Sequence, residues 1–153
     1  MITCIKDQLI RDEGVRLVKY LDSRGFWTIG VGHNLDAKPL PFDVSGGITF
    51  AQATQILGDA DYNPGDDLGD VSFQLFRDLP WLKDLDVVRQ GVFLNMGFNM
   101  GVGGILEFHH DLADTQAGNY VKAAADMKAS AWYTQVGARA QRLCQQMISG
   151  VWQ

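Results

Sequence analysis

The chain has 153 residues, of which 46% are hydrophobic, and it carries a formal net charge of -5. This length fits one domain with a buried core. The acidic balance argues against a general nucleic-acid binder, which needs a basic face for phosphate. No apolar run reaches the roughly 20 residues that span a membrane, so we expect no membrane insertion. Residues 1–7 lack the apolar stretch of a signal peptide, and we expect a cytoplasmic protein.

The first part of the chain predicts a helix followed by a β-hairpin. Gly14 is a natural stop directly after Glu13, which therefore ends the helix. The β-rich segments 17–21 and 26–29 flank a turn that begins at Asp22. We therefore expect Asp22 at the tip of the hairpin.

The rest of the chain predicts helices. Thr49 and Gln52 form a capping box, so a helix begins there, and the sequence Asn63-Pro64-Gly65 ends it. Further helices are expected around 73–76, 86–99, 119–132 and 138–149. The segment 86–99 is almost entirely apolar and should be the central buried helix.

These elements predict an α+β fold in which a cleft separates two lobes. We divide the single domain into a small β-hairpin lobe over 14–48 and a larger all-helical lobe over 1–13 and 66–153. An inter-lobe helix and loop over 49–65 would join them.

Two cysteines, Cys4 and Cys144, stand near opposite ends of the chain. Neither has the close spacing of a zinc site or a redox pair. Two free thiols in the core are the favoured interpretation. A disulfide between the two ends of the chain is the alternative that the sequence leaves open.

Two acidic residues at the predicted cleft are candidates for hydrolytic chemistry. Glycoside hydrolysis needs a carboxylic acid to protonate the leaving oxygen and a carboxylate to activate water or attack the sugar. Glu13 and Asp22 come from different elements, so they can face each other across a cleft. Thr28, on the return strand, would position the water. The bare spacing of these residues is weak evidence, since acidic proteins contain it by chance.

The residues around this trio are more specific. The segment 9–14 (Leu-Ile-Arg-Asp-Glu-Gly), then Asp22, then 28–33 (Thr-Ile-Gly-Val-Gly-His) resemble the active-site segment of the phage-type lysozymes, the endolysin muramidases. Further blocks agree in the same order, at 47–49, 95–101, 132–133, 139–142 and 150–152. Ordered agreement over most of the chain is far more specific than any single motif.

The resemblance implies a lysozyme-like fold and a reaction. The substrate would be peptidoglycan, cut at the β-1,4 bond between N-acetylmuramic acid and N-acetylglucosamine, with no metal or cofactor. Glu13 would be the general acid, with Asp22 and Thr28 as its catalytic partners. Both the resemblance and Thr28 favour inversion at the anomeric carbon.

The resemblance also implies which residues bind the substrate, namely Asn34, Phe98, Asn99, Asp111 and Asp126. Of the residues around Phe98, we expect Met96 and Met100 in the core. Gly97, Asp111 and Asp126 fall at cleft or near-cleft positions where relatives vary, so subsite preference does not transfer. His109 and His110 are expected at the surface, because adjacent residues seldom converge on one metal ion.

Three further side chains have supporting roles by the same resemblance. Arg139 would pair with Glu13, and Arg142 would pair with Asp12. His33 would pair with an aspartate, here Asp59 or Asp61, and we assign it to stability rather than to catalysis.

The acidic segment 59–70 has a second interpretation. Its oxygens are spaced roughly as in a calcium loop, but Pro64 stands where that loop needs glycine and Asp70 where it needs glutamate. An acidic solvated loop is favoured, and calcium binding is the alternative. Because Pro64 interrupts what the resemblance would make a long helix, the hinge between the lobes should differ from that of relatives.

Two other functions are weighed against hydrolysis. A lytic transglycosylase needs the acid without the water-activating pair, and a non-catalytic wall-binding protein needs only the scaffold. The presence of Glu13, Asp22 and Thr28 argues against both. The resemblance implies a monomeric endolysin that waits in the host cytoplasm until a holin opens the inner membrane. It would then cut peptidoglycan in the periplasm and lyse the cell.

Overall fold

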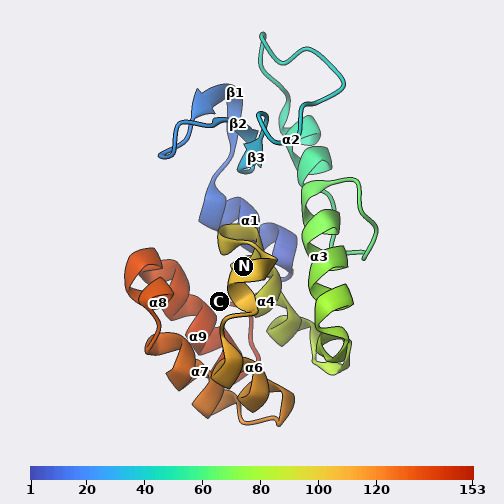
Figure 1. The fold of residues 1–153 in the computed structure, drawn as a ribbon. Helices are drawn as coiled ribbons and strands as arrows, with labels where there is room; N and C mark the ends of the chain where they lie inside the picture. The colour runs from blue at the N-terminus through green and yellow to red at the C-terminus, as the bar shows by residue number, and fades with distance from the viewer.

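The structure is a computed structural model that describes residues 1–153. A three-stranded antiparallel sheet of order β1-β2-β3 lies near the N-terminus, and helices make up the rest (Figure 1). The elements in chain order are α1 (Ile5–Glu13), β1 (Arg16–Leu21), β2 (Trp27–Gly30), β3 (His33–Asn34), α2 (Phe50–Leu57), α3 (Asp67–Asp78), the 3-10 helix η1 (Pro80–Asp84), α4 (Val87–Met100), α5 (Val102–Ile105), α6 (His109–Gln116), α7 (Tyr120–Lys128), α8 (Ala131–Val136) and α9 (Ala138–Ser149). The predicted α+β fold is confirmed. No helix combines the length and the apolar character that a membrane crossing requires.

The first helix and the hairpin form as the sequence predicts. Gly14 adopts a φ of 74°, a conformation that costs glycine little, and it ends α1 directly after Glu13. β1 pairs with β2 so that Tyr20 lies opposite Thr28, and Asp22 begins the connecting turn. The strand β3 was not predicted, because two residues are too few to show an alternating pattern.

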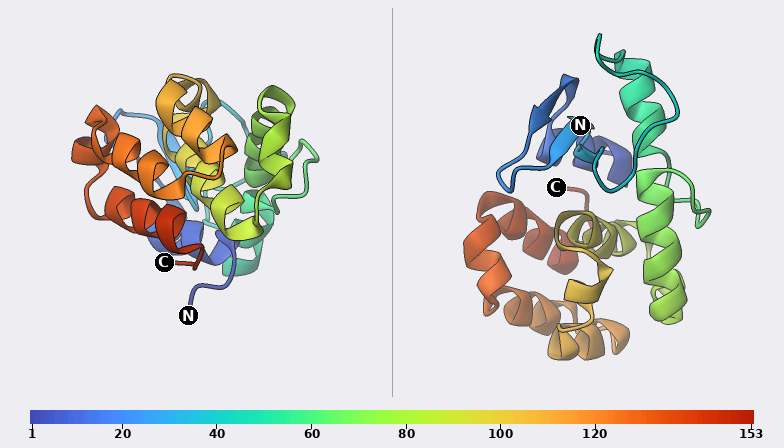
Figure 2. Two further views of the ribbon diagram at one scale, coloured as in Figure 1. Left: turned by 90° about the horizontal axis from the view of Figure 1, so that it is seen from below. Right: turned by 45° about the horizontal axis from the view of Figure 1, so that its top comes forward.

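The connection between the lobes departs from the prediction. The capping box of Thr49 and Gln52 is present, but α2 ends at Leu57 rather than at the sequence 63–65. Gly58 ends it, with a φ of 73°, and a Cβ atom at this position would overlap the Asp66 carboxylate. That carboxylate accepts a hydrogen bond from the N–H of Gly69 and caps α3. The chain therefore leaves the helix before Pro64, and α2 and α3 follow one another along one side of the molecule (Figures 1 and 2).

The helical lobe is built around α4. Phe93 and Met96 on this helix are completely buried, as expected for a central helix. The predicted helix over 119–132 is instead two helices, α7 and α8, because the hydroxyl of Ser130 accepts a hydrogen bond from the N–H of Tyr133 and starts α8. The predicted segment 73–76 extends to all of α3, and α5, α6 and η1 were not predicted.

The two cysteines do not meet. Cys4 precedes α1 and is exposed, whereas Cys144 is buried in α9, and both thiols are free. Burial raises the pKa of Cys144 to about 11, so this thiol stays protonated at neutral pH. Both thiols are free and Cys144 is in the core, as predicted, but the expected core position of Cys4 is wrong, because this residue precedes the first turn of α1.

The carboxylates of the acidic segment 59–70 bind separate donors. Asp59 pairs with Lys6, Asp61 accepts a hydrogen bond from the N–H of Asn63, and Asp70 pairs with Lys38 at 2.6 Å. No three His, Cys, Asp or Glu side chains gather closely enough to hold a metal ion. The geometry therefore favours the acidic loop over the calcium site.

His33 joins the β lobe to the helical lobe. Its Nδ1 lies 2.7 Å from a carboxylate oxygen of Asp67, at the start of α3, and its Nε2 lies 2.8 Å from the carbonyl oxygen of Lys38. The expected partners, Asp59 and Asp61, are wrong, because α2 ends early and the loop carries both away from His33. Two acceptors favour the imidazolium, in which both nitrogens donate. Burial alone would lower the pKa of His33, but the hydrogen bond and charge of Asp67 outweigh it and raise that pKa.

This pair predicts a pH-dependent stability. A raised pKa in the folded protein stabilises it fully below the pKa of the unfolded chain, and this contribution disappears as pH rises through the folded pKa. Asp67→Asn should therefore cost about 1.5–3 kcal/mol of unfolding free energy at pH 5.5 and clearly less at pH 9, as measured by urea denaturation. An equal loss at both pH values would show that the charge of His33 does not matter.

Candidate active site

Glu13 is held at the end of α1 by an arginine from the other end of the chain. Its Oε1 accepts a hydrogen bond from Nη1 of Arg139 at 2.7 Å. The side chain of Glu13 remains 22% exposed, whereas that of Arg139 is 10% exposed. The carboxyl group is thus fixed in one orientation and still accessible to a substrate.

Asn95 of α4 stands at the centre of a buried polar network beneath this pair. Its Oδ1 accepts a hydrogen bond from Nε of Arg139 at 2.7 Å, and its Nδ2 donates to Asp12 and to Gln8. Asn95 is fully buried. Sequence reasoning gave it no role, although a polar residue within a nearly apolar helix is a signal of such a network.

Asp12 anchors the network next to Glu13. Its side chain is only 1% exposed, and Oδ1 accepts hydrogen bonds from Nη2 of Arg142 and Nε of Arg11, each at 2.8 Å. Burial is the largest single influence on the pKa of Asp12 and would raise it, but the hydrogen bonds from Arg11, Asn95 and Arg142 together lower it. Both ion pairs that the resemblance implies, Arg139 with Glu13 and Arg142 with Asp12, are present.

The hairpin turn binds the second carboxylate. Oδ1 of Asp22 accepts hydrogen bonds from the N–H groups of Phe26 and Arg24, each at 2.9 Å. The hydrogen bond from Phe26 contributes most to a lowered pKa of Asp22, which is therefore ionised at neutral pH.

Thr28 is tied to the same turn. Its hydroxyl donates to the carbonyl oxygen of Phe26 at 3.0 Å, and this oxygen also accepts from the N–H of Asp22. The backbone of Phe26 thus positions both Asp22 and Thr28. Because the hydroxyl proton of Thr28 is already engaged, its oxygen is left to accept a hydrogen bond from another molecule.

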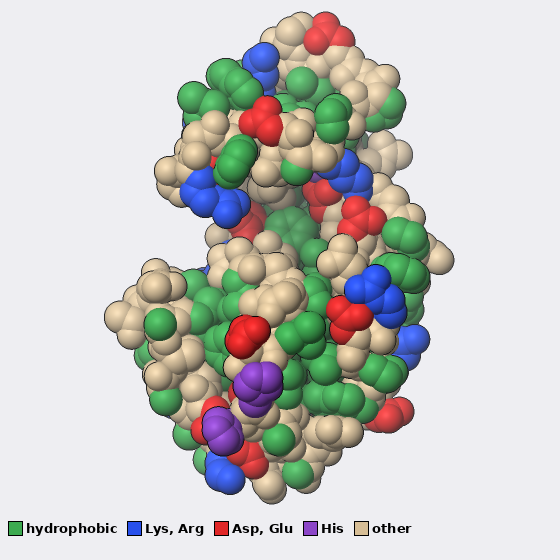
Figure 3. Space-filling model, in the orientation of Figure 1, with side chains coloured by type: hydrophobic (Ala, Val, Ile, Leu, Met, Phe, Trp, Pro, Cys, Tyr) green, Lys and Arg blue, Asp and Glu red, His purple; other side chains and the backbone are tan.

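Glu13 lies next to Gly32, which together with Phe98 lines a hollow between the lobes. A methyl group on Gly32 would lie 3.4 Å from Oε2 of Glu13 and 3.7 Å from Cε1 of Phe98, so these two side chains border one space. Phe98 and Asn34 line a hollow of about 240 Å³. Figure 3 shows that the surface is hollowed between the upper and lower lobes. An extended polymer would fit such a cleft.

The other residues expected to bind substrate are not among those that line this hollow. Asn99 is exposed, and its Oδ1 accepts a hydrogen bond from Nε1 of Trp132 at 3.1 Å. Asp111 and Asp126 line a separate pocket in the helical lobe. Gly97 is buried against Val71, a residue that itself lines the hollow. Met96 is in the core and His109 and His110 are exposed, as predicted.

Comparison with known proteins identifies the family of the chain. The family model described as phage lysozyme matches residues 11–146. The chain is 33% identical to the pre-baseplate central spike protein Gp5 of Enterobacteria phage T4, over 94% of this chain and 27% of that protein. It is 29% identical to probable T4-type lysozyme 1 of Dictyostelium discoideum, over 98% of this chain and 96% of that protein. Probable T4-type lysozyme 2 of the same organism is 26% identical, over 94% and 92%.

The chain thus spans about a quarter of the phage spike protein but nearly the full length of the two Dictyostelium proteins. The matched family segment contains Glu13, Asp22, Thr28 and both arginines that bind the acidic pair. It also covers most of the helical lobe. The chain therefore belongs to the phage lysozyme family and is a glycoside hydrolase of the lysozyme type that acts on peptidoglycan.

Proposed function

We propose that the protein cuts the β-1,4 bond between N-acetylmuramic acid and N-acetylglucosamine with Glu13 as general acid. The arrangement of Glu13 carries the proposal. Arg139 binds Oε1, while Oε2 lies beside Gly32 at the hollow. Because a guanidinium can only donate, Oε1 acts as an acceptor and Oε2 is the oxygen that carries the proton. That proton passes to the glycosidic oxygen as its bond to the anomeric carbon breaks.

Asp22 and Thr28 act on the attacking water in this proposal. The lowered pKa of Asp22 keeps it able to accept a proton from water. The Thr28 oxygen accepts a second hydrogen bond from the same water, since its own proton is given to Phe26. Direct attack by this water would invert the anomeric carbon.

The proposal predicts the effect of removing the acid. Glu13→Gln keeps the shape and the hydrogen bond with Arg139 but has no proton to give, so clearing of outer-membrane-stripped Gram-negative peptidoglycan should fall at least about 100-fold. Mass spectrometry of wild-type products should show reducing-end muramic acid. Asp84→Asn, at an exposed carboxylate of η1, is the control and should clear normally.

Two results would contradict this assignment. Anhydro ends in the wild-type products would mean transglycosylation, which needs no water. Folded wild type that binds the wall and releases nothing would be a binding protein on a lysozyme scaffold.

Arg139 is predicted to act by positioning Glu13. Arg139→Gln should lower kcat by about 10- to 100-fold and reduce the unfolding free energy by about 1.5–3 kcal/mol, because Glu13 and Asn95 lose a charged donor. Arg142→Gln is the matched control, since it breaks an ion pair to the buried Asp12. It should lower the unfolding free energy but reduce kcat much less than Arg139→Gln does. Equal losses of kcat in both variants would show that Arg139 has only a structural role.

We also propose the endolysin role. A monomer would accumulate in the host cytoplasm and reach the periplasmic wall after a holin opens the inner membrane. Family membership supports this proposal. Expression in a Gram-negative host should leave cells intact, and co-expression with a holin should clear the culture within minutes. The Glu13→Gln variant should not lyse cells, and lysis by the wild type without a holin would refute the dependence.

A further inference from the structure

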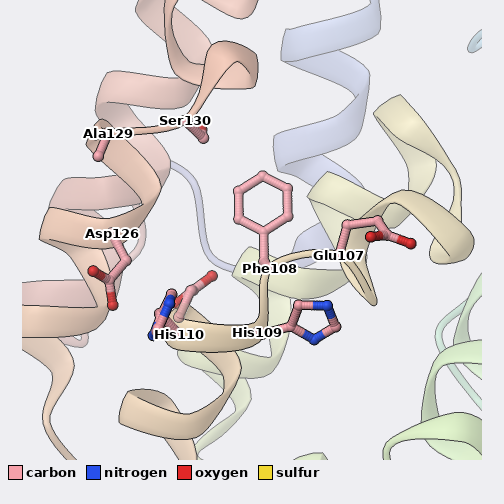
Figure 4. A pocket seen from close by; sticks show the side chains of 8 residues that line it. Glu107, Phe108, His109, His110, Asp126, Ala129 and Ser130 are labelled. Atoms are coloured by element: carbon pink, nitrogen blue, oxygen red, sulfur yellow. The ribbon is translucent and has the colours of Figure 1, made fainter.

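A second pocket lies in the helical lobe, apart from Glu13 and Asp22. It has a volume of about 280 Å³. Its lining comes from the start of α6 and the two residues before it, from α7, and from the link between α7 and α8: Glu107, Phe108, His109, His110, Asp111, Asp126, Ala129 and Ser130 (Figure 4). We call it the Asp111 pocket.

Two carboxylate oxygens in the Asp111 pocket have no partner. Asp111 is 1% exposed, and its Oδ1 accepts a hydrogen bond from the hydroxyl of Thr115 at 3.2 Å. Oδ2 of Asp111 and Oδ2 of Asp126 are both buried and receive no hydrogen bond. Burying a carboxylate oxygen without a hydrogen-bond donor costs free energy, because the oxygen loses its hydrogen bonds to water. A pocket with two such oxygens is therefore suited to a ligand that supplies the donors.

The neighbouring charges do not supply that donor. Asp114, on the same helix as Asp111, is paired with Lys122 at 3.4 Å, whereas neither Asp111 nor Asp126 forms an ion pair. Burial, with smaller contributions from the charges of Asp126 and Asp114, raises the pKa of Asp111 to about 7. The other titratable groups near the site are Glu107, His109 and His110 at the pocket, Lys128 on α7 and Cys144 on α9. Asp111 and Asp126 therefore line one pocket, and neither is paired with a cation.

The pocket suits an organic cation better than a metal ion. No three His, Cys, Asp or Glu side chains here could hold a metal. The ring of Phe108 stands between Asp126 and Glu107 in Figure 4. An aromatic face attracts a cation and also packs against an alkyl chain. Acidic oxygens beside an aromatic ring thus match a positively charged group on a short apolar stem.

We propose that the Asp111 pocket binds a primary ammonium group on a short alkyl chain, which donates to the free oxygens of Asp111 and Asp126. The ammonium supplies the donors that both oxygens lack, and Phe108 contacts the alkyl chain. Two sources carry this chemistry, the side-chain amine of a diamino acid in a wall peptide and a soluble diamine. The assignment to a wall peptide rests on the proposed function, whereas the binding of an amine does not.

Amine binding is coupled to the release of a proton. The ammonium binds the ionised form of Asp111, so affinity increases with pH and levels off above the pKa. With a pKa of about 7, binding should be about tenfold weaker at pH 6 than at pH 8. The amine itself stays protonated over this whole range.

The test is a titration of intact protein with 1,5-diaminopentane, followed by NMR shifts of the Asp111 pocket. The neutral analogue 1,5-pentanediol and the variant Asp84→Asn are the controls. Diamine should bind the wild type and Asp84→Asn alike, tenfold more weakly at pH 6 than at pH 8, and the diol should not bind. Asp111→Asn and Asp126→Asn should each lose binding. Binding of the diol, or unchanged binding in both variants, would overturn the proposal.

Stability provides a second readout that does not depend on ligand. Asp111→Asn removes a buried charge without a partner, so the variant should fold and be at least as stable as wild type at pH 8.

Glu13→Gln should bind the diamine normally, so failed hydrolysis and failed amine binding can be told apart. Hydrolysis of amine-acetylated wall then separates the sources. If the wall peptide is the source, acetylation should raise the KM of the wild type several-fold and leave the KM of Asp111→Asn unchanged. If a soluble amine is the source, acetylation should leave the KM of the wild type unchanged while the diamine still binds.

Discussion

The contact between Arg139 and Glu13 is the interaction on which the account depends. It joins the last residue of α1 to the start of α9, and so it fixes where the carboxyl of the proposed general acid stands on the helical lobe. The guanidinium is itself held by Asn95, so the orientation of Glu13 is set by buried groups rather than by solvent. A proton donor fixed in advance loses little entropy when the substrate binds.

The carboxylates of Glu13 and Asp22 are positioned by different physical means. Glu13 is placed by long-range packing, since its partner lies 126 positions further along the chain. Asp22 is placed locally, by the N–H groups of a four-residue neighbourhood that ends at Phe26. The same backbone residue also positions Thr28. The position of the Glu13 carboxyl thus depends on packing in the helical lobe, whereas the position of the Asp22 carboxylate depends only on a hairpin turn.

The sequence predicts what is local and misses what depends on contacts. Gly14, the turn at Asp22 and the capping box at Thr49 each act within a few residues, and all three appear as expected. The early end of α2 was missed because it occurs where Asp66 packs against Gly58, a contact that no periodic pattern encodes. The partner of His33 was misplaced for the same reason. Roles for Glu13, Asp22 and Thr28 came from ordered resemblance, since their bare spacing is not specific.

The anomeric configuration of the first product tests the central claim most directly. Proton NMR of a short peptidoglycan oligomer, recorded during the first turnovers and before mutarotation, distinguishes the two outcomes. If Asp22 and Thr28 direct a water onto the anomeric carbon while Glu13 protonates the leaving oxygen, the new reducing end must appear as the α-anomer. A β-anomer would mean two successive displacements through a covalent intermediate, and the roles assigned to Asp22 and Thr28 would be wrong.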